Sequence, residues 1–358
     1  MRTTRRGFSL HDLFGLLMVI GVVAMIGMAA VLRARDASRR ALCVSNLKQI
    51  AQALHSYQAT HGSYPLGVTA SFNTFSAAMS AGVRTQGQPT DWSGWSAQAL
   101  MLQYLDQTPL YNSINFDFEP HANAQEVAFN TTATETRVSI FLCPNDLYAG
   151  RPSLNNYYAS IGTTIQSMSH RPTGVFGYQS LCRSSDITDG EANTVAFAEG
   201  LSGSWQPRRY RGNGVVNVGT HFADPDTATA ERYPDQLMRN LQACHDAFNA
   251  PIAAANIFSG DRGRYWSWGA ESMALFNTIV PPNSTQFVFN QCRYICTGCF
   301  LRDADHSDIT NASSYHPGGA HVLFCNGSVR FVKSSITMRT WWALGTRSSG
   351  DAVSADSF

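Results

Sequence analysis

Residues Leu13–Leu32 read LFGLLMVIGVVAMIGMAAVL, a run of twenty residues without a charge. A helix needs about 20 apolar residues to cross the roughly 30 Å hydrocarbon layer of a bilayer. The segment before this run is short and basic, with Arg2, Arg5 and Arg6. The pattern therefore predicts one membrane-spanning helix close to the N-terminus.

The residues in front of the apolar run distinguish between kinds of targeting segment. An ordinary secretory signal is cleaved after its apolar stretch, at small residues. Here the small residue, Gly7, lies before that stretch and is followed directly by Phe8. This order disfavours a cleaved secretory signal. An uncleaved signal anchor is the alternative, because hydropathy alone fits it equally well.

The segment from Arg5 to Leu10 resembles the class III signal of type IV prepilins and type II secretion pseudopilins. In that family a short basic leader ends in glycine, a prepilin peptidase cuts behind it on the cytoplasmic side, and the new N-terminus is methylated. The resemblance implies cleavage between Gly7 and Phe8 and methylation of Phe8. The fifth mature residue is usually Glu in this family and is Asp12 here, and the resemblance assigns it to subunit assembly.

The helical pattern continues beyond the apolar run. No proline occurs before Pro65, and one apolar face recurs at helical spacing through Leu47, Ile50, Ala51, Leu54 and Tyr57. Gly62 followed by Pro65 ends the pattern. The sequence predicts one helix from Leu13 to about Thr60, roughly 70 Å long at 1.5 Å per residue. A membrane anchor followed by a separate amphipathic helix is the alternative.

This pattern divides the chain into four segments. They are a leader (residues 1–7), the transmembrane half of the helix (8–32), its amphipathic half (33–62) and an extracytoplasmic pilin-like globular domain (63–358). The expected fold class is α+β and pilin-like, with the long N-terminal helix packed on a mainly antiparallel β-sheet that carries long loop insertions.

Beyond Pro65 the sequence shows short apolar runs separated by turn signals. Residues 67–95 are rich in Gly, Ser and Thr and are interpreted as loop. A helix is expected over Trp95–Leu105. Short strands are expected over Val138–Cys143, Thr194–Glu199, Gln286–Phe289 and Tyr294–Leu301.

A hairpin is predicted near the C-terminus, where Asn326-Gly327 lies between two apolar runs. Asn-Gly is the strongest short-range hairpin signal and favours a two-residue type I′ turn. Pairing outward from such a turn sets Phe324 opposite Val329 and Val322 opposite Phe331. These four side chains would then form one apolar patch against the long helix, with His321 and Arg330 on the other face.

The segment from His316 to Gly327 resembles the H-x9-D-G segment of a large bacterial family of prepilin-like proteins, which carries the domain of unknown function 1559. Asn326 replaces the usual Asp. Other matching pieces are Cys43 with residues 46–50, residues 141–146, 156–158, 186–190 and 193–194, and Glu199. The resemblance places an H-x9-N-G hairpin at 316–332 and implies a secretion-apparatus context. It implies no biochemical activity.

The chain has eight cysteines, and at least one disulfide is expected if the domain is extracytoplasmic. The pairs are expected within Cys292, Cys296 and Cys299, or between Cys143 and Cys182, although spacing does not fix connectivity. A zinc cluster of Cys292, Cys296 and Cys299 with His306 is the disfavoured alternative, because structural zinc sites use four ligands at close pair spacings.

Other candidate chemistry is interpreted as structural. His316 is expected to anchor a loop by hydrogen bonds, in preference to a catalytic or metal-binding role. Asp186, Asp189 and Glu199 could bind calcium, but EF-hand spacing is absent and turn or capping roles are favoured. No cofactor or metal is expected, and the chain is interpreted as non-enzymatic. With 14% charged residues and a net charge of +1, nucleic acid is not an expected partner.

Two functions are compatible with these patterns. The first is a subunit of a type II secretion or type IV pilus-like system, with the prepilin peptidase, other pilin-like subunits and the inner membrane as partners. The second is a membrane-tethered extracytoplasmic module that binds surface glycans or small ligands. Oligomerisation through the apolar helix would distinguish the two.

Both functions imply a single pass through the inner membrane, with a cytoplasmic N-terminus and the bulk of the chain periplasmic or extracellular. Counting basic residues alone would favour the reverse orientation, because Arg33, Arg35, Arg39 and Arg40 follow the apolar run. Large domains translocate largely regardless of charge, so the C-terminal bulk is placed outside.

We predict that the mature chain begins with methylated Phe8. The basic leader, the small residue at the junction and the apolar run directly behind it are the reasons. Intact-mass analysis of the chain, purified from cells that contain a prepilin peptidase, measures this directly. A chain that still begins with Met1 in such cells would contradict the prediction.

Overall fold

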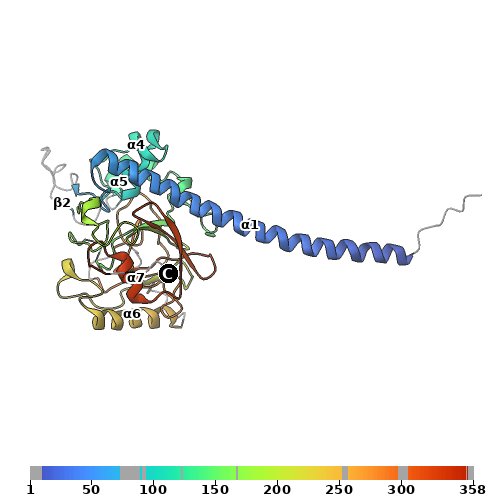
Figure 1. Cartoon of the computed structure of the whole chain (residues 1–358). Helices are drawn as coiled ribbons and strands as arrows, with labels where there is room; N and C mark the ends of the chain where they lie inside the picture. Colours follow the sequence, from blue (N-terminus) through green and yellow to red (C-terminus); the bar gives the residue numbers. More distant parts are fainter. Residues whose placement is uncertain are drawn as a thin grey trace, which may run out of the picture.

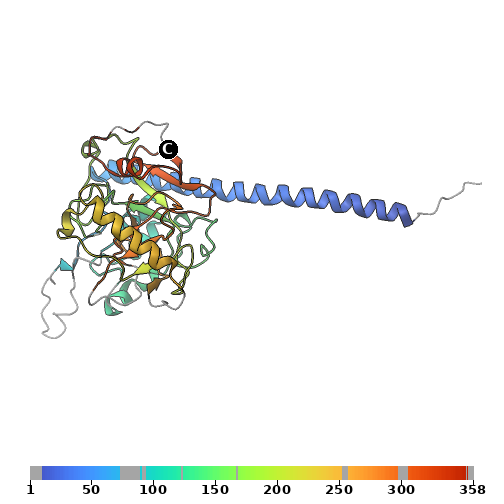
Figure 2. The ribbon, with the colours of Figure 1, turned by 90° about the horizontal axis from the view of Figure 1, so that it is seen from below.

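Helix α1 (Leu10–His61) of the computed structural model is continuous from the apolar run to the globular body. Its 52 residues span roughly 78 Å at 1.5 Å per residue. In both Figure 1 and Figure 2 its N-terminal half projects away from the body and its C-terminal half runs across it. The helix ends at Gly62, whose positive φ of 74° suits a C-terminal cap. The predicted single helix is confirmed, and the alternative of two separate helices is wrong.

The structure describes residues 10–72, 89–90, 94–121, 124–166, 168–251, 257–296, 305–351 and 353. The leader and Phe8 lie outside this part of the chain. Asp12 lies within α1, but its side chain is outside the described part, as are the side chains of residues 22–27 and 29.

The membrane span predicted for Leu13–Leu32 includes these undescribed side chains. Within the part of the chain that the structure describes, no helix meets the length and apolarity expected of a membrane span.

The C-terminal half of α1 packs on the body through the face that the sequence predicts. Leu47, Ile50, Ala51 and Leu54 are buried in the main hydrophobic core, and Tyr57 packs at its edge. Each large aliphatic side chain buried in this way contributes about 1.5–3 kcal/mol. The apolar stripe therefore holds this half of the helix to the body.

A five-stranded sheet lies beneath α1. Its strand order is β11-β10-β4-β3-β7, and only the β3–β7 pair is parallel. The strands are β3 (Tyr157–Ser160), β4 (Val195–Glu199), β7 (Leu275–Phe276), β10 (Gly319–Phe324) and β11 (Val329–Lys333). Leu323 belongs to the same core as α1, whereas Val322 and Phe324 pack with Trp341 of α7 (Met338–Gly345). Helices thus cover both faces of the sheet.

A second, four-stranded sheet has the order β6-β5-β8-β9. Its strands are β5 (Gly214–Val216), β6 (Phe258–Ser259), β8 (Gln291–Arg293) and β9 (Ile309–Thr310), of which β5 and β8 are parallel. Helix α6 (Pro234–Asn249) packs on this sheet through Leu237, Leu241 and Phe248. Figure 1 shows α6 at the end of the body away from α1 and α4 (Thr108–Ser113). The α+β class is confirmed, with two mixed sheets in which most strand pairs are antiparallel.

The remaining elements are short. They are β1 (Ser71–Phe72), β2 (Pro89–Thr90), α3 (Ala97–Leu100), η1 (Leu102–Tyr104), α5 (Ala124–Thr134), η2 (Ser139–Phe141), η3 (Ser184–Asp186) and η4 (Pro225–Thr227).

The expected helix over Trp95–Leu105 is confirmed as α3 and η1, and the expected strand over Thr194–Glu199 is confirmed as β4. The strand expected over Val138–Cys143 is wrong, because residues 139–141 form a 3-10 turn that buries Phe141 in the core. The strand expected over Gln286–Phe289 is also wrong, since β8 begins only at Gln291. A short apolar run can be buried in a loop as well as in a strand, so such a run alone does not identify a strand.

The C-terminal hairpin forms, but its predicted register is wrong by one residue. Leu323 pairs with Val329 and His321 pairs with Phe331. The Phe324 N–H donates to the Ser328 carbonyl at 2.9 Å, which leaves a three-residue loop. Only Gly327 has a positive φ, 83°, as in a type I turn followed by a left-handed residue.

This shift changes which side chains share a face. Leu323 and Val329 now face the core that contains α1, together with the paired His321 and Phe331. The predicted patch of Val322, Phe324, Val329 and Phe331 is therefore wrong. Cys325, which lies in this loop, is fully buried against the same core.

We predict that Gly327→Val lowers the free energy of unfolding by about 1–3 kcal/mol, the typical cost of backbone strain at positive φ. A Cβ atom at this position would also lie 3.1 Å from His55 Nε2 on α1. Gly150→Val is the matched control, because Gly150 is exposed with no heavy atom within 4 Å of an added Cβ. Thermal unfolding of the two variants gives the comparison, and equal melting temperatures would contradict the prediction.

Candidate functional site

The last residue of β4, Glu199, is a carboxylate that is 1% exposed. The antiparallel register that pairs Val322 with Ala198 sets His321 of β10 opposite it. The His321 backbone N–H donates to Glu199 Oε2 at 2.8 Å, and His321 Nδ1 lies 3.0 Å from the same oxygen. His316 Nε2 lies 3.3 Å from Glu199 Oε1. Three donors from the H-x9-N-G segment thus surround one buried carboxylate.

The outer nitrogen of each imidazole also has a partner. Arg40 of α1 donates from Nε to His321 Nε2 at 3.2 Å, and Asn145 Nδ2 lies 3.3 Å from His316 Nδ1. A neutral imidazole both donates and accepts, so each histidine can accept on one nitrogen and donate to Glu199 from the other. The result is a hydrogen-bonded chain that joins α1, β4, β10 and the loop at residues 144–146.

Aromatic contacts complete the site. The His316 and His321 rings lie with centroids 4.9 Å apart, and the guanidinium of Arg40 lies 4.3 Å from the ring centroid of Phe331. Burial alone would raise the pKa of Glu199, but hydrogen bonds from His316 and His321 outweigh burial and hold that pKa below its ordinary value. Glu199 is therefore ionised inside the body.

A disulfide lies directly beside this carboxylate. Cys43 of α1 is bonded to Cys143, and His316 Nε2 lies 4.0 Å from Cys143 Sγ. The expected pair of Cys143 with Cys182 is wrong, because Cys182 and Cys325 are both buried free thiols. The two bonded residues are separated by 100 positions. In the chain-entropy account a loop of that length contributes about 4–5 kcal/mol.

Among the remaining cysteines, Cys292 differs from the expected pairing. Cys292 pairs with Cys244 of α6, so it bonds neither Cys296 nor Cys299. Cys296 is disulfide-bonded, and Cys299 lies outside the described residues. Because Cys292 is in a disulfide with Cys244, it is not available as a ligand of the disfavoured zinc cluster with His306. Within the described chain, His306 contacts Asp305 at 3.2 Å.

Two further family-like segments support the disulfide. Asn156 accepts from the Cys143 backbone N–H at 3.0 Å and donates to Asp146 Oδ2 at 2.6 Å. The same carboxylate oxygen accepts from the N–H and hydroxyl of Ser202. The Phe141–Asp146 segment is thereby tied to the residues that follow β4. Cys43, Glu199, His316 and the family-like segments at residues 141–146 and 156–158 thus meet around one point.

The other predicted residues lie elsewhere. Asp186 caps a 3-10 turn through the Arg183 N–H, and Asp189 accepts from the N–H groups of Ser349 and Gly350. These are the turn and capping roles that the sequence favours over calcium binding. Asn326 accepts from Ser328 within the exposed hairpin turn.

The site also brings together potential metal ligands. Cys43, Cys143, Glu199 and His316 each offer one ligand atom, and these atoms all lie within 4.8 Å of one another. The sequence predicts no metal site here, and it misses the contributions of Cys43 and His321. The sequence offered only the family resemblance around Cys43 and Glu199. Such a resemblance does not show that two residues lie close together in the folded protein.

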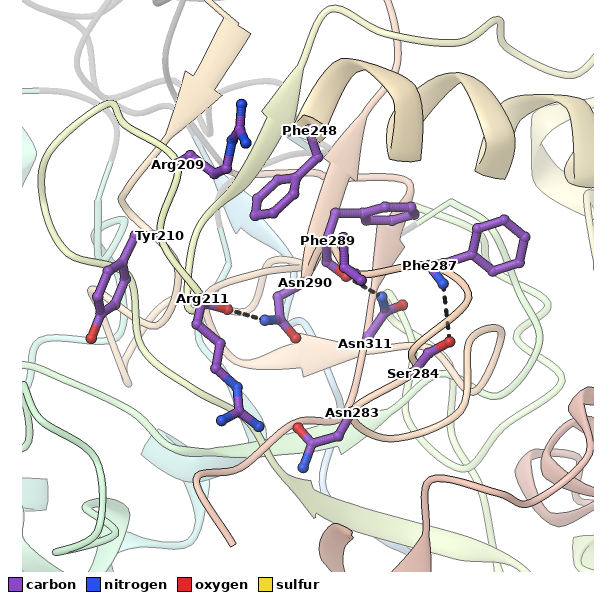
Figure 3. A pocket seen from close by; sticks show the side chains of 11 residues that line it. Arg209, Tyr210, Arg211, Phe248, Asn283, Ser284, Phe287, Phe289, Asn290 and Asn311 are labelled. Atoms are coloured by element: carbon purple, nitrogen blue, oxygen red, sulfur yellow. Dashed lines mark hydrogen bonds between the residues drawn. The ribbon is translucent and has the colours of Figure 1, made fainter. Parts of the chain in front are cut away.

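A pocket of about 420 Å³ lies beside the loop that carries His316. Asn283, on its wall, donates to the Gly319 carbonyl at 2.7 Å and contacts the His316 carbonyl. Figure 3 shows three phenylalanine rings in the upper part of the view, with Arg209 beside Phe248 and with Arg211 and Asn283 below them. The rings are Phe248, Phe287 and Phe289, and the polar residues include Arg209, Arg211, Asn283, Asn290 and Asn311.

A buried arginine holds the backbone of the polar wall of the pocket by hydrogen bonds. Arg262, fully buried, donates from Nη1 to the Asn290 carbonyl at 2.6 Å and from Nη2 to the Asn311 carbonyl. Asn311 Nδ2 donates to the Phe289 carbonyl at 2.8 Å, which leaves its buried Oδ1 without a protein donor. The pocket therefore offers two cations and an apolar wall.

We predict that Glu199→Gln lowers the free energy of unfolding by about 1.5–3 kcal/mol at pH 7, the scale of hydrogen bonds to a charged group. The folded pKa is depressed, so this stability is fully present above the unfolded pKa of about 4.3 and is lost as pH falls through the folded pKa. Denaturant unfolding from pH 7 to pH 3 should show the difference from wild type shrinking only below about pH 4.3. Glu191→Gln, at a half-buried glutamate, is the control, and a pH-independent difference would contradict the prediction.

Comparison with known proteins supports one assignment. The family described as "Protein of unknown function (DUF1559)" matches residues 33–339, which is most of the chain. No curated protein and no solved structure matches the chain. The match contains Cys43, Cys143, Glu199 and His316, so the whole cluster lies within the family region. The chain belongs to the DUF1559 family.

Proposed function

We propose that the chain is a non-enzymatic, prepilin-like subunit that is processed by a prepilin peptidase and assembles in a type II secretion or type IV pilus-like system. The observation that carries the proposal is the division of α1. One half is fixed to the body by an apolar face and a disulfide, and the other half projects as bare helix (Figure 1).

Apolar side chains on the projecting half support a role in the membrane or in assembly. Leu10, Phe14, Leu17, Met18 and Val19 are each more than half exposed. Exposed apolar area of this kind marks a surface that lipid or another protein covers. The basic leader and the Gly7-Phe8 junction in the sequence support a position of this helix in the inner membrane, with the body outside.

The cluster around Glu199 supports a structural role for the H-x9-N-G segment. His316, His321, Asn145 and Arg40 satisfy one another and the carboxylate. Such a network fixes the angle between α1 and the sheet, because moving the helix would leave a buried carboxylate with fewer donors. A fixed angle is what a subunit needs if identical helices are to pack regularly.

We predict that Asp12→Ala is still cleaved after Gly7 and still inserts, but no longer crosslinks to neighbouring subunits. A lone carboxylate near lipid costs about 2.5–3.5 kcal/mol, so it requires a partner. The proposed partner is the amine of Phe8 on the next subunit. Asp12→Glu, which restores the usual pilin residue, should assemble at least as well as wild type.

Asp36→Ala is the matched control, since Asp36 is an exposed carboxylate of α1 beyond the apolar run. In-cell crosslinking followed by immunoblotting measures assembly, and intact mass measures cleavage. Crosslinking of Asp12→Ala at the wild-type level would instead favour an Asp12 that is solvated at the headgroup boundary.

The pocket beside His316 favours a second candidate function, a membrane-tethered module that binds an acidic sugar. Phenylalanine rings suit the apolar face of a sugar ring, and Arg209 and Arg211 suit a carboxylate. None of the described residues that line the pocket is acidic.

Under this second function we predict that oligogalacturonate binds the wild-type chain and that an Arg209→Gln/Arg211→Gln variant binds at least tenfold more weakly. Loss of a charge-assisted hydrogen bond costs about 1.5–3 kcal/mol, and 1.4 kcal/mol corresponds to tenfold. Arg239→Gln, at an exposed arginine of α6 outside the pocket, is the control. Titration calorimetry on the detergent-solubilised chain measures the affinities, and equal affinities would exclude this pocket as the sugar site.

A further inference from the structure

The disulfide beside Glu199 lies within a set of four metal-ligand types. Cys43, Cys143, Glu199 and His316 are all buried, and one ligand atom from each lies within 4.8 Å of the other three. They come from four separate segments, namely α1, the loop at residue 143, the end of β4 and the loop before β10. The fold, and not a local sequence motif, brings them together.

We infer that these four residues form a divalent-metal site when the Cys43–Cys143 disulfide is reduced, with Zn²⁺ as the fitting ion. Two thiolates, one imidazole and one carboxylate are all established zinc ligands, and four of them complete a tetrahedral site. The inference is independent of the proposed assembly function, because it concerns only the body and the docked half of α1.

The distances between these atoms suit such a site. With bonds of about 2.0–2.1 Å to nitrogen and oxygen, neighbouring ligand atoms of a zinc tetrahedron lie about 3.3 Å apart. His316 Nε2 and Glu199 Oε1 are 3.3 Å apart. A sulfur atom at about 2.3 Å from the ion would lie about 3.6 Å from that nitrogen, and Cys143 Sγ lies 4.0 Å from it. The main change required is separation of the two sulfur atoms to about 3.8 Å.

Outer hydrogen-bond partners for these ligands are already in place. Glu199 Oε2 accepts from the N–H of His321, and His321 Nδ1 lies 3.0 Å from Oε2 and 3.1 Å from Oε1, so Oε2 can keep both donors when Oε1 binds the metal. When His316 binds through Nε2, its proton resides on Nδ1, and a flip of the Asn145 amide presents an oxygen to accept it. Zinc-bound histidine and carboxylate ligands are normally oriented by such partners.

The redox step balances with a dithiol as the reductant. The dithiol gives two electrons and two protons, becomes a disulfide, and converts the Cys43–Cys143 bond into two thiols. Zinc binding then displaces one proton from each thiol, so two protons leave per ion. Glu199 is already ionised, and the imidazole proton of His316 moves from Nε2 to Nδ1 without loss. The disulfide and the metal are therefore alternative links between α1 and the body.

The test uses the full chain in detergent. The protein is reduced anaerobically with a phosphine, which is oxidised to the phosphine oxide with oxygen from water, and is then equilibrated with ZnCl₂ and desalted. Elemental analysis should find one zinc per chain for the reduced protein at this site, and none there for the oxidised protein. With Co²⁺ as a probe, the reduced protein should show a thiolate-to-cobalt charge-transfer band.

Cysteine variants assign the zinc to this site. Cys43→Ser and Cys143→Ser should lose it, as should His316→Ala. Cys244→Ser and Cys325→Ser, which alter cysteines outside the cluster, should retain it. Asn145→Ala, at a half-buried position that is expected to fold, should bind zinc about 10–100-fold more weakly.

Two results would overturn the inference. One is a reduced wild-type chain that binds no zinc at all. The other is zinc that remains in Cys43→Ser, or that binds Asn145→Ala as tightly as wild type, since the ion would then lie elsewhere. If His316→Ala does not fold, the Asn145→Ala affinity still decides between these outcomes.

Discussion

A carboxylate cannot remain charged inside a protein unless donors replace the water that it loses. At Glu199 those donors come from His321 on the neighbouring strand and from His316 in the preceding loop, and Arg40 of α1 supports them from outside. This requirement brings residues from several elements to the same place. The long helix, the hairpin and the loop at Cys143 all meet at the point where one negative charge must be compensated.

The same arrangement explains why the two halves of α1 differ in their contacts. Its C-terminal half has an apolar stripe, a disulfide and a polar contact, with Asn46 donating to the Leu142 carbonyl at 2.9 Å. Its N-terminal half shows apolar side chains to the surroundings, among them Phe14, Met18 and Val19. A helix that is rigid, held at one end and uncovered at the other suits a protein whose partners bind the free end.

The sequence predicts well those elements that have a local pattern of residue types. Leu47, Ile50 and Leu54 mark the docked face of α1, because their spacing of three or four residues is a local property of the sequence. Asn326-Gly327 marks the hairpin, because the turn preference of these two residues is also local. The dipeptide Asn-Gly fits both a two-residue and a three-residue loop, so it does not fix the register of the hairpin. The Cys43–Cys143 pair and the His321–Glu199 contact depend on strand order across more than 90 residues, which no local pattern encodes.

The Cys43–Cys143 bond also determines how the body responds to mechanical tension along α1. The residues on the N-terminal side of Cys43 are linked to the body by this covalent bond. Tension along α1 therefore reaches the disulfide before it stretches any hydrogen bond of the sheet. A pull on the projecting half would therefore be transmitted to residue 143, and the docked turns beyond Cys43 would be shielded from peeling. Once the bond is opened, the same pull would act on the apolar stripe turn by turn, so the force at which the helix detaches would depend on the oxidation state of two sulfur atoms.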